Sequence, residues 1–501
     1  MNSSICPLIL NGENLNPESL VDAAASNHLV DLSEDAWKRI AASRAIVDRI
    51  VDSGQAAYGV TTGVGSQKDF AVSAEVVASY NERLIKAHAT RVPGPTLKPI
   101  TVRAALIYMA NAYGRGFSGV SEDLVRLLLN KINTAEMPEI DATGSVGASD
   151  LVPLAQIADW LLSSEEAKAL GLPRAKEALS LINSNAISLA TGAEHLVEAK
   201  RLLNTFDLSA AVALEGFRGN LWALSRHANA AHRRKGQAKS AEAMQQILEA
   251  SILWKKGESR FLQDPLSFRC ASQVHGAAGQ VLNNALENWT VELNTVHDNP
   301  IIDLEIQSAV SHGNMDTTGM TLAIDSLRQA LAKVCDIAGE RLHKQQWPAF
   351  SGLPTGLSEE GSAFGGVQFL NLGHIAASLI ASAKIWAHPH LLISVGQLAD
   401  GVEDTAGYAL HAVYDLGRIV DAAWKVVSIE LIISVWAILR RRVAMESLGV
   451  GVRPIVKHLQ PMLPINTEGD DIFQIAPILD IVRGGKLLNS QPSRVVPNQD
   501  L

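Results

Sequence analysis

Apolar side chains recur at steps of three and four residues along much of the second half of the chain. Residues 194–214 show this pattern most clearly, and residues 375–385 and 419–439 are similarly rich in Ala, Leu and Ile. Such spacing places apolar side chains on one face of an α-helix, and small residues let neighbouring helices pack closely. The pattern therefore predicts an all-α fold with a central bundle of long helices. In residues 194–214 the apolar stripe comprises Leu196, Ala199, Leu203, Phe206, Ala210 and Ala213.

The first 150 residues are more mixed, with shorter helical patterns between glycine-rich segments at 59–65, 114–119 and 144–147. A chain of 501 residues is long enough for more than one domain-sized unit. We therefore expect an N-terminal domain over residues 1–190, followed by a bundle of central and C-terminal long helices over residues 191–501.

The most apolar segment, residues 426–439, contains Glu430 and is shorter than the roughly 20 residues that cross a bilayer. It predicts a buried helix of the bundle and no membrane partner. The first residues have neither a charged start nor a long apolar stretch, so no signal peptide is expected. Cys6, Cys270 and Cys335 are a sparse, odd set without a zinc pattern, which suits a reducing cytoplasm.

Charge and histidine spacing bear on two classes of partner, nucleic acids and metal ions. The formal net charge is −9, and no basic run is long enough to predict nucleic-acid binding. His297, His312, His388 and His390 have no standard metal-ligand spacing with nearby acidic residues, so no metal site is expected. Neither a nucleic acid nor a metal ion is therefore expected as a partner.

The most informative stretch is residues 143–154, which read Thr-Gly-Ser-Val-Gly-Ala-Ser-Asp-Leu-Val-Pro-Leu. It resembles the signature Gly-Ser-Val-Gly-Ala-Ser-Gly-Asp-Leu-x-Pro-Leu of the aromatic amino-acid ammonia-lyases, a family of histidine, phenylalanine and tyrosine lyases and related aminomutases. In that family the Ala-Ser-Gly tripeptide cyclises and loses water to form an electrophile, 4-methylidene-imidazol-5-one. The resemblance implies a carbon–nitrogen lyase whose cofactor forms at Ala148, Ser149 and Asp150.

The chain departs from this signature at one position, because Ala148 and Ser149 run straight into Asp150. Cyclisation needs the third backbone nitrogen to attack the first carbonyl, and glycine permits the tight approach because it has no Cβ. Two interpretations remain open: the written sequence omits a residue at a modified position, or the encoded chain lacks the glycine. A third is a plain loop in which Asp150 caps the start of a helix.

Residues 58–65, Tyr-Gly-Val-Thr-Thr-Gly-Val-Gly, resemble a family loop whose Tyr removes the β-proton of the substrate. The resemblance gives this role to Tyr58, and the glycines make a mobile lid plausible. A free phenol titrates near 10, so a base role needs a lowered pKa or an activated substrate proton.

Residues 84–89 are most similar to the selectivity segment of histidine lyases, which implies that His88 contacts the substrate. The alternative for a lone helical His is packing.

Two further segments resemble family motifs that hold the substrate. Residues 176–183 resemble Lys-Glu-Gly-Leu-x-Leu-Ile-Asn, which places Asn183 beside the electrophile and the substrate amine. Residues 263–270 resemble Gln-Asp-x-Tyr-Ser-x-Arg-Cys, which implies that Arg269 clamps the substrate carboxylate in bidentate geometry, with Gln263 as polar support. The alternatives are a helix cap for Asn183 and a structural salt bridge for Arg269.

Three positions of the implied substrate site differ from the family. Leu266 stands where the family has a Tyr, Met315 where it has a Phe, and Ser382 roughly where histidine lyases have a Glu that engages the imidazole. These departures and the missing glycine favour a catalytically silent paralogue. The retained Tyr58 and Arg269, together with Asn183, favour an active enzyme.

The resemblance runs from about Tyr58 to Pro389 and includes an Asp-Asn-Pro motif within residues 294–300. It implies an ammonia-lyase that acts on a histidine-, tyrosine- or phenylalanine-type substrate and releases an α,β-unsaturated acid. Family members are homotetramers whose active sites draw on several subunits, so we expect a homotetramer with the electrophile loop in residues 1–190. An aminomutase that forms a β-amino acid remains an alternative.

Overall fold

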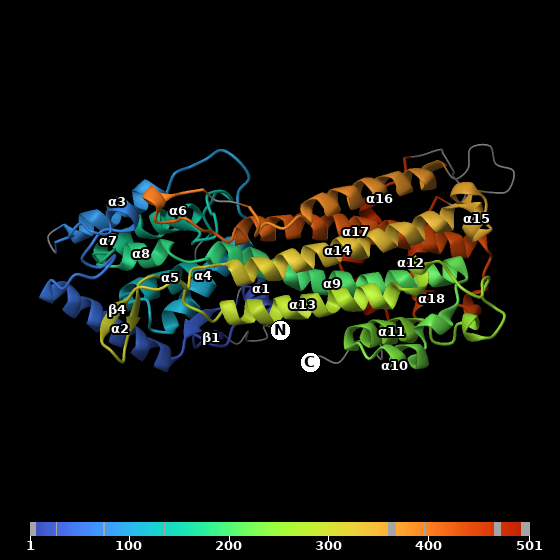
Figure 1. Cartoon of the computed structure of the whole chain (residues 1–501), viewed down its shortest axis with the longest axis horizontal. Coiled ribbons are helices and arrows are strands. Elements are labelled where there is room, and N and C mark those ends of the chain that lie inside the picture. Colours follow the sequence, from blue (N-terminus) through green and yellow to red (C-terminus); the bar gives the residue numbers. More distant parts are fainter. Residues whose placement is uncertain are drawn as a thin grey trace. The chain divides into compact units, whose positions relative to one another are not determined.

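The computed structural model describes residues 7–26, 28–73, 76–134, 136–358, 367–393, 396–464 and 472–491. Cys6 lies outside these residues. The described chain is mainly helical and contains two short strand pairs (Figure 1). The predicted all-α class is therefore confirmed.

Contacts between residues divide the chain into two compact units. The first comprises Met1–Val197, Asn284–Asp325 and Pro389–Tyr414, and the second comprises Glu198–Asn283, Ser326–His388 and Asp415–Leu501. The predicted boundary after residue 190 lies near the first division, but the sequence pattern did not indicate that two later segments return to the first unit. The domain limits 1–190 and 191–501 stay a prediction. Four of the five divisions fall within long helices, namely α9 (Ala186–Phe217), α13 (Ala271–Glu292), α14 (Thr318–Gln346) and α17 (Ala409–Arg440), and the fifth lies between His388 and Pro389.

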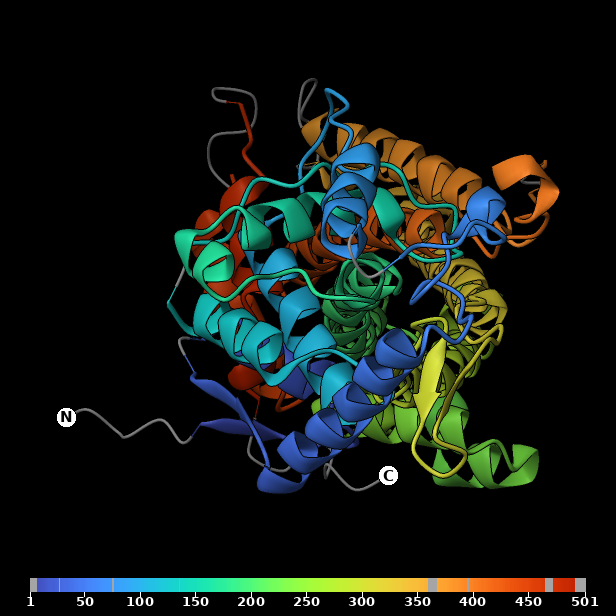
Figure 2. The same ribbon diagram turned by 90° about the vertical axis from the view of Figure 1, so that its left-hand side faces the viewer.

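The first unit is built around α4, which is buried along most of its length and packs against α1, α2 and α5. Two strands near the start of the chain, β1 (Leu8–Leu10) and β2 (Val30–Leu32), pair in parallel. A hairpin of β3 (Ile301–Asp303) and β4 (Ser308–Val310) lies beside α2 (Figure 2). The helices of this unit are α1 (Pro17–Ala25), α2 (Glu34–Ser53), α3 (Val77–His88), α4 (Pro99–Gly114), α5 (Glu122–Thr134), α6 (Leu151–Leu162), α7 (Glu165–Ala169) and α8 (Glu177–Ile182).

The second unit contains most of the long-helix bundle, and the helices predicted from apolar spacing are present as α9, α16 and α17. The six stripe residues of residues 194–214 are all buried. Its other helices are α10 (Arg226–His232), α11 (Lys235–Ile247), α12 (Leu266–Arg269), α15 (Pro348–Ser351), α16 (Val367–Trp386), α18 (Val452–Leu459), α19 (Ala476–Arg483) and α20 (Lys486–Asn489).

Glu430 explains why a charge interrupts the most apolar segment. Its carboxylate is fully buried and accepts hydrogen bonds from Arg341 Nη2 at 3.1 Å and Ser209 Oγ at 2.8 Å, which ties α17 to α14 and α9 within the second unit. The length argument against a membrane span was wrong, because α17 has 32 residues. In the described part of the chain it is the one helix long and apolar enough to cross a membrane, and most of its apolar window is buried inside the protein. The predicted burial is therefore confirmed.

Candidate active site

The segment 143–150 forms a strained turn in the first unit. Ser149 is buried and has φ +76°, a left-handed conformation that costs a non-glycine residue about 1–3 kcal/mol. Gly147 has φ +99°, and a Cβ there would lie 2.5 Å from the backbone nitrogen of Tyr408. The carbonyl oxygen of Gly147 accepts a hydrogen bond from Thr317 Oγ1 at 2.9 Å. Surrounding structure therefore holds the turn in a conformation that it would not adopt alone.

Asn183 lies directly beside Ser149. The Ser149 hydroxyl donates to Asn183 Oδ1 at 2.6 Å, and Asn183 Nδ2 donates to the carbonyl oxygen of Asn299 at 2.9 Å. The backbone N–H of Asn183 also closes the C-terminus of α8 on Leu179. The structure thus places Asn183 where the resemblance implied, and the helix-end alternative holds for the same residue.

Asn185 is a site residue that the sequence reasoning missed. Its Oδ1 accepts from the backbone nitrogen of Ser149 at 3.2 Å, and its Nδ2 donates to the carbonyl oxygen of Met315 at 3.0 Å. Met315 is thereby brought next to the turn, as expected from its motif. The sequence feature that could have identified Asn185 is its position two residues after Asn183.

Asp150 is anchored on both its backbone and its side chain. Its N–H donates to the carbonyl oxygen of Ser184 at 2.7 Å, and its carboxylate accepts from Ser188 N at 2.8 Å and Ser188 Oγ at 2.9 Å. Burial raises the pKa of the Asp150 carboxyl above its ordinary value. Asp150 occupies the N-cap position of α6, as the loop interpretation expected, but its side chain makes no capping bond there.

The residues at this turn do not fit formation of 4-methylidene-imidazol-5-one. Ring closure needs the nitrogen after Ser149 to attack the carbonyl carbon of Ala148, but that nitrogen belongs to Asp150 and donates to Ser184. Asp150 also carries a Cβ and a fixed side chain where the family has glycine. No chemical step is therefore derived through this group.

The loop that carries Tyr58 packs on the helix that ends at Asn183. A Cβ at Gly59 would lie 2.3 Å from Leu179 Cδ2 of α8, so only glycine permits this approach. Tyr58 is half-buried, and its hydroxyl oxygen accepts from Gly65 N at 3.0 Å. Tyr80 is a close neighbour: burial raises its pKa, and Tyr58 adds to the effect.

His88 is the last residue of α3, which packs against α6 and α8. Its Nδ1 lies 2.8 Å from the carbonyl oxygen of Leu84. Because a carbonyl oxygen only accepts, Nδ1 carries the hydrogen, and Nε2 remains as an acceptor in the neutral ring. His88 is therefore oriented by its own helix and can offer one nitrogen to a substrate.

The residue that precedes α8, Lys176, forms a buried ion pair with Asp298. Lys176 Nζ lies 2.7 Å from Asp298 Oδ2 and 3.0 Å from Ser180 Oγ. Burial lowers the pKa of Lys176, while Asp298 works in the opposite direction. Asp298 precedes Asn299, whose carbonyl oxygen accepts from Asn183, so the Asp-Asn-Pro motif contacts both Lys176 and Asn183.

Arg269 and Gln263 lie together in the second unit, at α12. With the Gln263 amide oxygen facing Arg269, it accepts from Nη1 at 2.9 Å and from Nη2 at 2.7 Å. Among the described residues Arg269 forms no ion pair, but Asp264 lies near enough for the guanidinium to offset part of the rise that burial gives the pKa of Asp264. Leu266 begins α12 and is 62% exposed, and the Ser382 hydroxyl of α16 donates to the carbonyl oxygen of Ser378.

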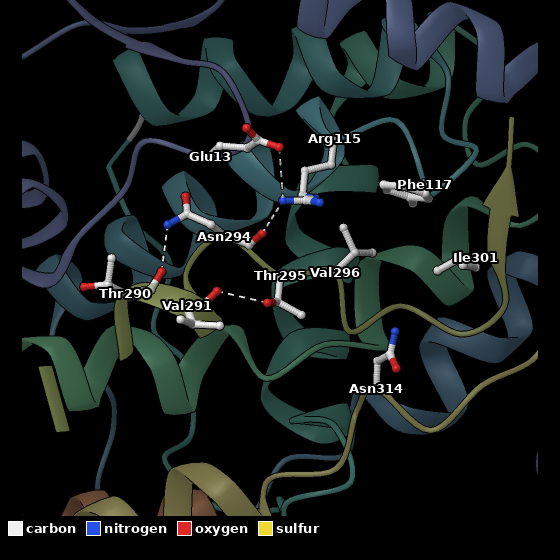
Figure 3. A pocket seen from close by; sticks show the side chains of 10 residues that line it. All are labelled: Glu13, Arg115, Phe117, Thr290, Val291, Asn294, Thr295, Val296, Ile301 and Asn314. Atoms are coloured by element: carbon white, nitrogen blue, oxygen red, sulfur yellow. Dashed lines mark hydrogen bonds and ion pairs between the residues drawn. The ribbon is translucent and has the colours of Figure 1, made fainter. Parts of the chain in front are cut away.

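A hollow of about 550 Å³ opens on the first unit (Figure 3). Arg115 projects into it and donates to the carbonyl oxygen of Asn294 at 2.6 Å, with Glu13 at 3.7 Å. Phe117 and Val296 form part of its apolar wall. The lining includes Asn294, Thr295 and Val296 from the segment with the Asp-Asn-Pro motif, but none of the predicted catalytic or substrate-binding residues, so the hollow is not assigned to the reaction.

Among the residues described, no three His, Cys, Asp or Glu side chains come together in a way that could hold a metal ion. The described chain thus combines a long-helix fold with a buried turn at Ser149 and the side chain of Asn183 beside it.

The family described as aromatic amino acid lyase matches residues 15–460, and the chain belongs to this family. It is 31% identical to the histidine ammonia-lyase of Caldanaerobacter subterraneus subsp. tengcongensis over 96% of this chain and 97% of that relative. Ergothionase of Treponema denticola, an ergothioneine-degrading enzyme solved with desmethyl-ergothioneine sulfonic acid, superposes with a TM-score of 0.88 at 27% identity, over 96% of this chain and 100% of that one. Histidine ammonia-lyase of Trypanosoma cruzi superposes with a TM-score of 0.86 at 25% identity, over 98% and 96%.

Proposed function

We propose that the chain eliminates the α-nitrogen group from an amino acid of the histidine type and releases an α,β-unsaturated acid. The observation that carries this proposal is the packing of the Tyr58 loop on α8, whose last turn presents Asn183 to Ser149. A candidate base and a fixed amide thus lie on two elements of the first unit that pack against each other. Elimination needs both, because the β-proton and the nitrogen leave from adjacent carbons.

Each proposed residue has a distinct task. Tyr58 accepts the β-proton, for which a positioned base supplies roughly 10²–10⁴-fold in rate. Asn183 fixes the region of the substrate nitrogen. Arg269 holds the carboxylate, since a guanidinium matches that group in bidentate geometry. His88 offers Nε2 to the substrate ring.

A histidine-type ring is supported by the curated relatives, which are named histidine ammonia-lyases, and by His88. Ser382 lacks the charge that engages an imidazole in histidine lyases, so unmodified histidine is expected to bind weakly. A second candidate is therefore a modified histidine. The likeness to ergothionase supports it, because ergothioneine is a betaine built on the histidine skeleton.

We further propose a cytoplasmic homotetramer whose active sites draw on several subunits, as the family resemblance implies. Sedimentation at micromolar concentration tests the assembly, and a monomer that retains full activity would contradict it.

The reaction is tested with a panel of histidine, histidine betaines, tyrosine and phenylalanine. Formation of the conjugated acid is followed by its ultraviolet absorption, with Tyr58→Phe as the control for catalysis at this site. We expect product from at least one histidine-type compound and none above background from the variant. A folded protein that converts none of the panel overturns the proposed function.

A further inference from the structure

We propose that the hollow beside Arg115 is a second binding site, separate from the turn at Ser149, and that it takes a small carboxylic acid with an apolar body. The hollow has a volume of about 550 Å³, within the range of roughly 300–1,000 Å³ that is usual for small-molecule pockets. Its described lining contains neither Tyr58 nor Asn183. A ligand bound there therefore leaves the candidate active site open.

Arg115 supplies the cationic end of the hollow. It follows the last residue of α4, and its side chain projects into the hollow (Figure 3). Nη1 donates to the carbonyl oxygen of Asn294 at 2.6 Å, which fixes one end of the guanidinium. In the described parts of the chain, Nε and Nη2 donate to no protein acceptor. These two nitrogens form the edge of a guanidinium that matches a carboxylate in bidentate geometry.

Glu13 is the one acidic residue in the described lining of the hollow. Its Oε1 lies 3.7 Å from Arg115 Nη1, and the Glu13 side chain is 74% exposed. An ion pair with so exposed a partner contributes little, because water and salt screen it. Glu13 therefore lowers the affinity for an acid only modestly and does not close the site.

The wall of the hollow is suited to the apolar body of the ligand. Four of its lining side chains are apolar, namely Phe117, Val291, Val296 and Ile301. Val291 lies in the last turn of α13 and is 65% exposed, so its surface is available to a ligand. A mainly apolar lining with a few placed polar groups is the usual composition of a small-molecule site.

Hydrogen bonds hold the hollow in shape without a ligand. The Asn294 side chain accepts from Leu15 N at 3.0 Å, donates to Leu15 O at 2.8 Å, and accepts from Asn111 Nδ2 at 3.2 Å. Ile302 N donates to the carbonyl oxygen of Phe117 at 2.7 Å, which ties this wall to β3. A preformed site loses little conformational freedom on binding, and this favours affinity.

The experiment measures binding to the full chain by isothermal titration calorimetry, with 3-phenylpropionate as the acid and 3-phenylpropionamide as its neutral counterpart. We expect the acid to bind, and the amide to bind at least about tenfold more weakly, because it cannot make charge-assisted hydrogen bonds through a carboxylate. Binding is measured without turnover, so the result does not depend on the proposed elimination. No binding of the acid, or equal binding of acid and amide, overturns the proposal.

Variants locate the bound acid. Arg115→Lys keeps the charge but loses the bidentate edge, so binding of the acid is expected to weaken by roughly 10–100-fold. Val291→Glu adds a negative charge at the exposed rim and should weaken binding without disturbing the core. Glu13→Gln should strengthen binding by up to about fivefold, because a repulsive charge is lost.

Arg126→Lys is the matched control, since Arg126 is an exposed cation outside the hollow, and it should bind the acid like the parent. Parent-like binding in both Arg115→Lys and Val291→Glu places the acid elsewhere in the protein and overturns the proposal.

Discussion

The hydroxyl of Ser149 donates a 2.6 Å hydrogen bond to the side-chain oxygen of Asn183, and the same amide donates to the carbonyl oxygen of Asn299. One side chain therefore links the turn at residues 143–150 to the segment that leads into β3. Because all three groups lie in the first unit, the geometry around Ser149 depends on contacts between distant parts of the sequence.

Replacement of Asn183 by Ala is expected to lower both stability and turnover. It leaves a buried Ser149 donor and the Asn299 carbonyl without their partner, which costs about 1–3 kcal/mol. Urea denaturation measures the free energy of unfolding, and initial rates measure turnover. The matched control is Asn130→Ala, whose exposed amide contacts only the neighbouring Glu166 and Thr134 side chains. Equal effects of the two variants would remove the proposed role of Asn183.

Tyr58→Phe is expected to reduce kcat by roughly 10²–10⁴-fold with little change in stability, because only the ionisable hydroxyl is lost. Tyr414→Phe should behave in the opposite way. The Tyr414 hydroxyl donates to the carbonyl oxygen of Ala142 at 2.8 Å, so its loss costs about 0.5–1.5 kcal/mol of stability and leaves turnover near the parent value. Steady-state kinetics and thermal denaturation of both variants separate the two effects. Parent-like turnover in Tyr58→Phe would exclude the base role.

Arg269→Lys is expected to raise KM more than it lowers kcat. The ammonium keeps the charge but loses one charge-assisted hydrogen bond to a carboxylate, worth about 1.5–3 kcal/mol, or roughly 10–100-fold in KM. Arg483→Lys is the control, since that guanidinium sits in a surface ion-pair cluster with Glu198 and Asp421. An unchanged KM in Arg269→Lys would show that Arg269 does not hold the substrate carboxylate.

Lys176→Met is expected to destabilise the protein by about 3–5 kcal/mol, because it leaves the buried Asp298 carboxylate without its cation. The double variant Lys176→Met, Asp298→Asn should recover part of that loss, since no uncompensated charge remains. Chemical denaturation of the three proteins gives the comparison. A double variant less stable than Lys176→Met alone would contradict the account of this ion pair.

The long helices could be predicted because the spacing of apolar residues at steps of three and four is a local property of the sequence. α9 and α17 nevertheless extend further than their clearest patterns. Fully buried helices carry apolar residues on all sides, so their ends show weakly in periodicity. The return of residues 284–325 and 389–414 to the first unit was not predictable, because it depends on contacts between distant segments.

The candidate site was likewise predictable from the sequence only in part. Asn183 could be placed beside Ser149 from motif resemblance, and the structure has them in contact. The partners of Asp150 could not be placed, because Ser184 and Ser188 lie more than thirty residues away and belong to no recognisable pattern. A carboxylate that precedes a helix most often caps that helix. Here the Asp150 carboxylate is buried and accepts hydrogen bonds from Ser188, near the start of α9.

The most direct test of the proposed elimination uses a histidine-type substrate with deuterium at both β-positions. Mass spectrometry then reads the products of the parent enzyme and of Tyr58→Phe. The account predicts an unsaturated acid that retains one of its two deuterium atoms, an equal amount of released amine, and loss of both products in the variant. A product that keeps both deuterium atoms, or that carries nitrogen on the β-carbon, would contradict it.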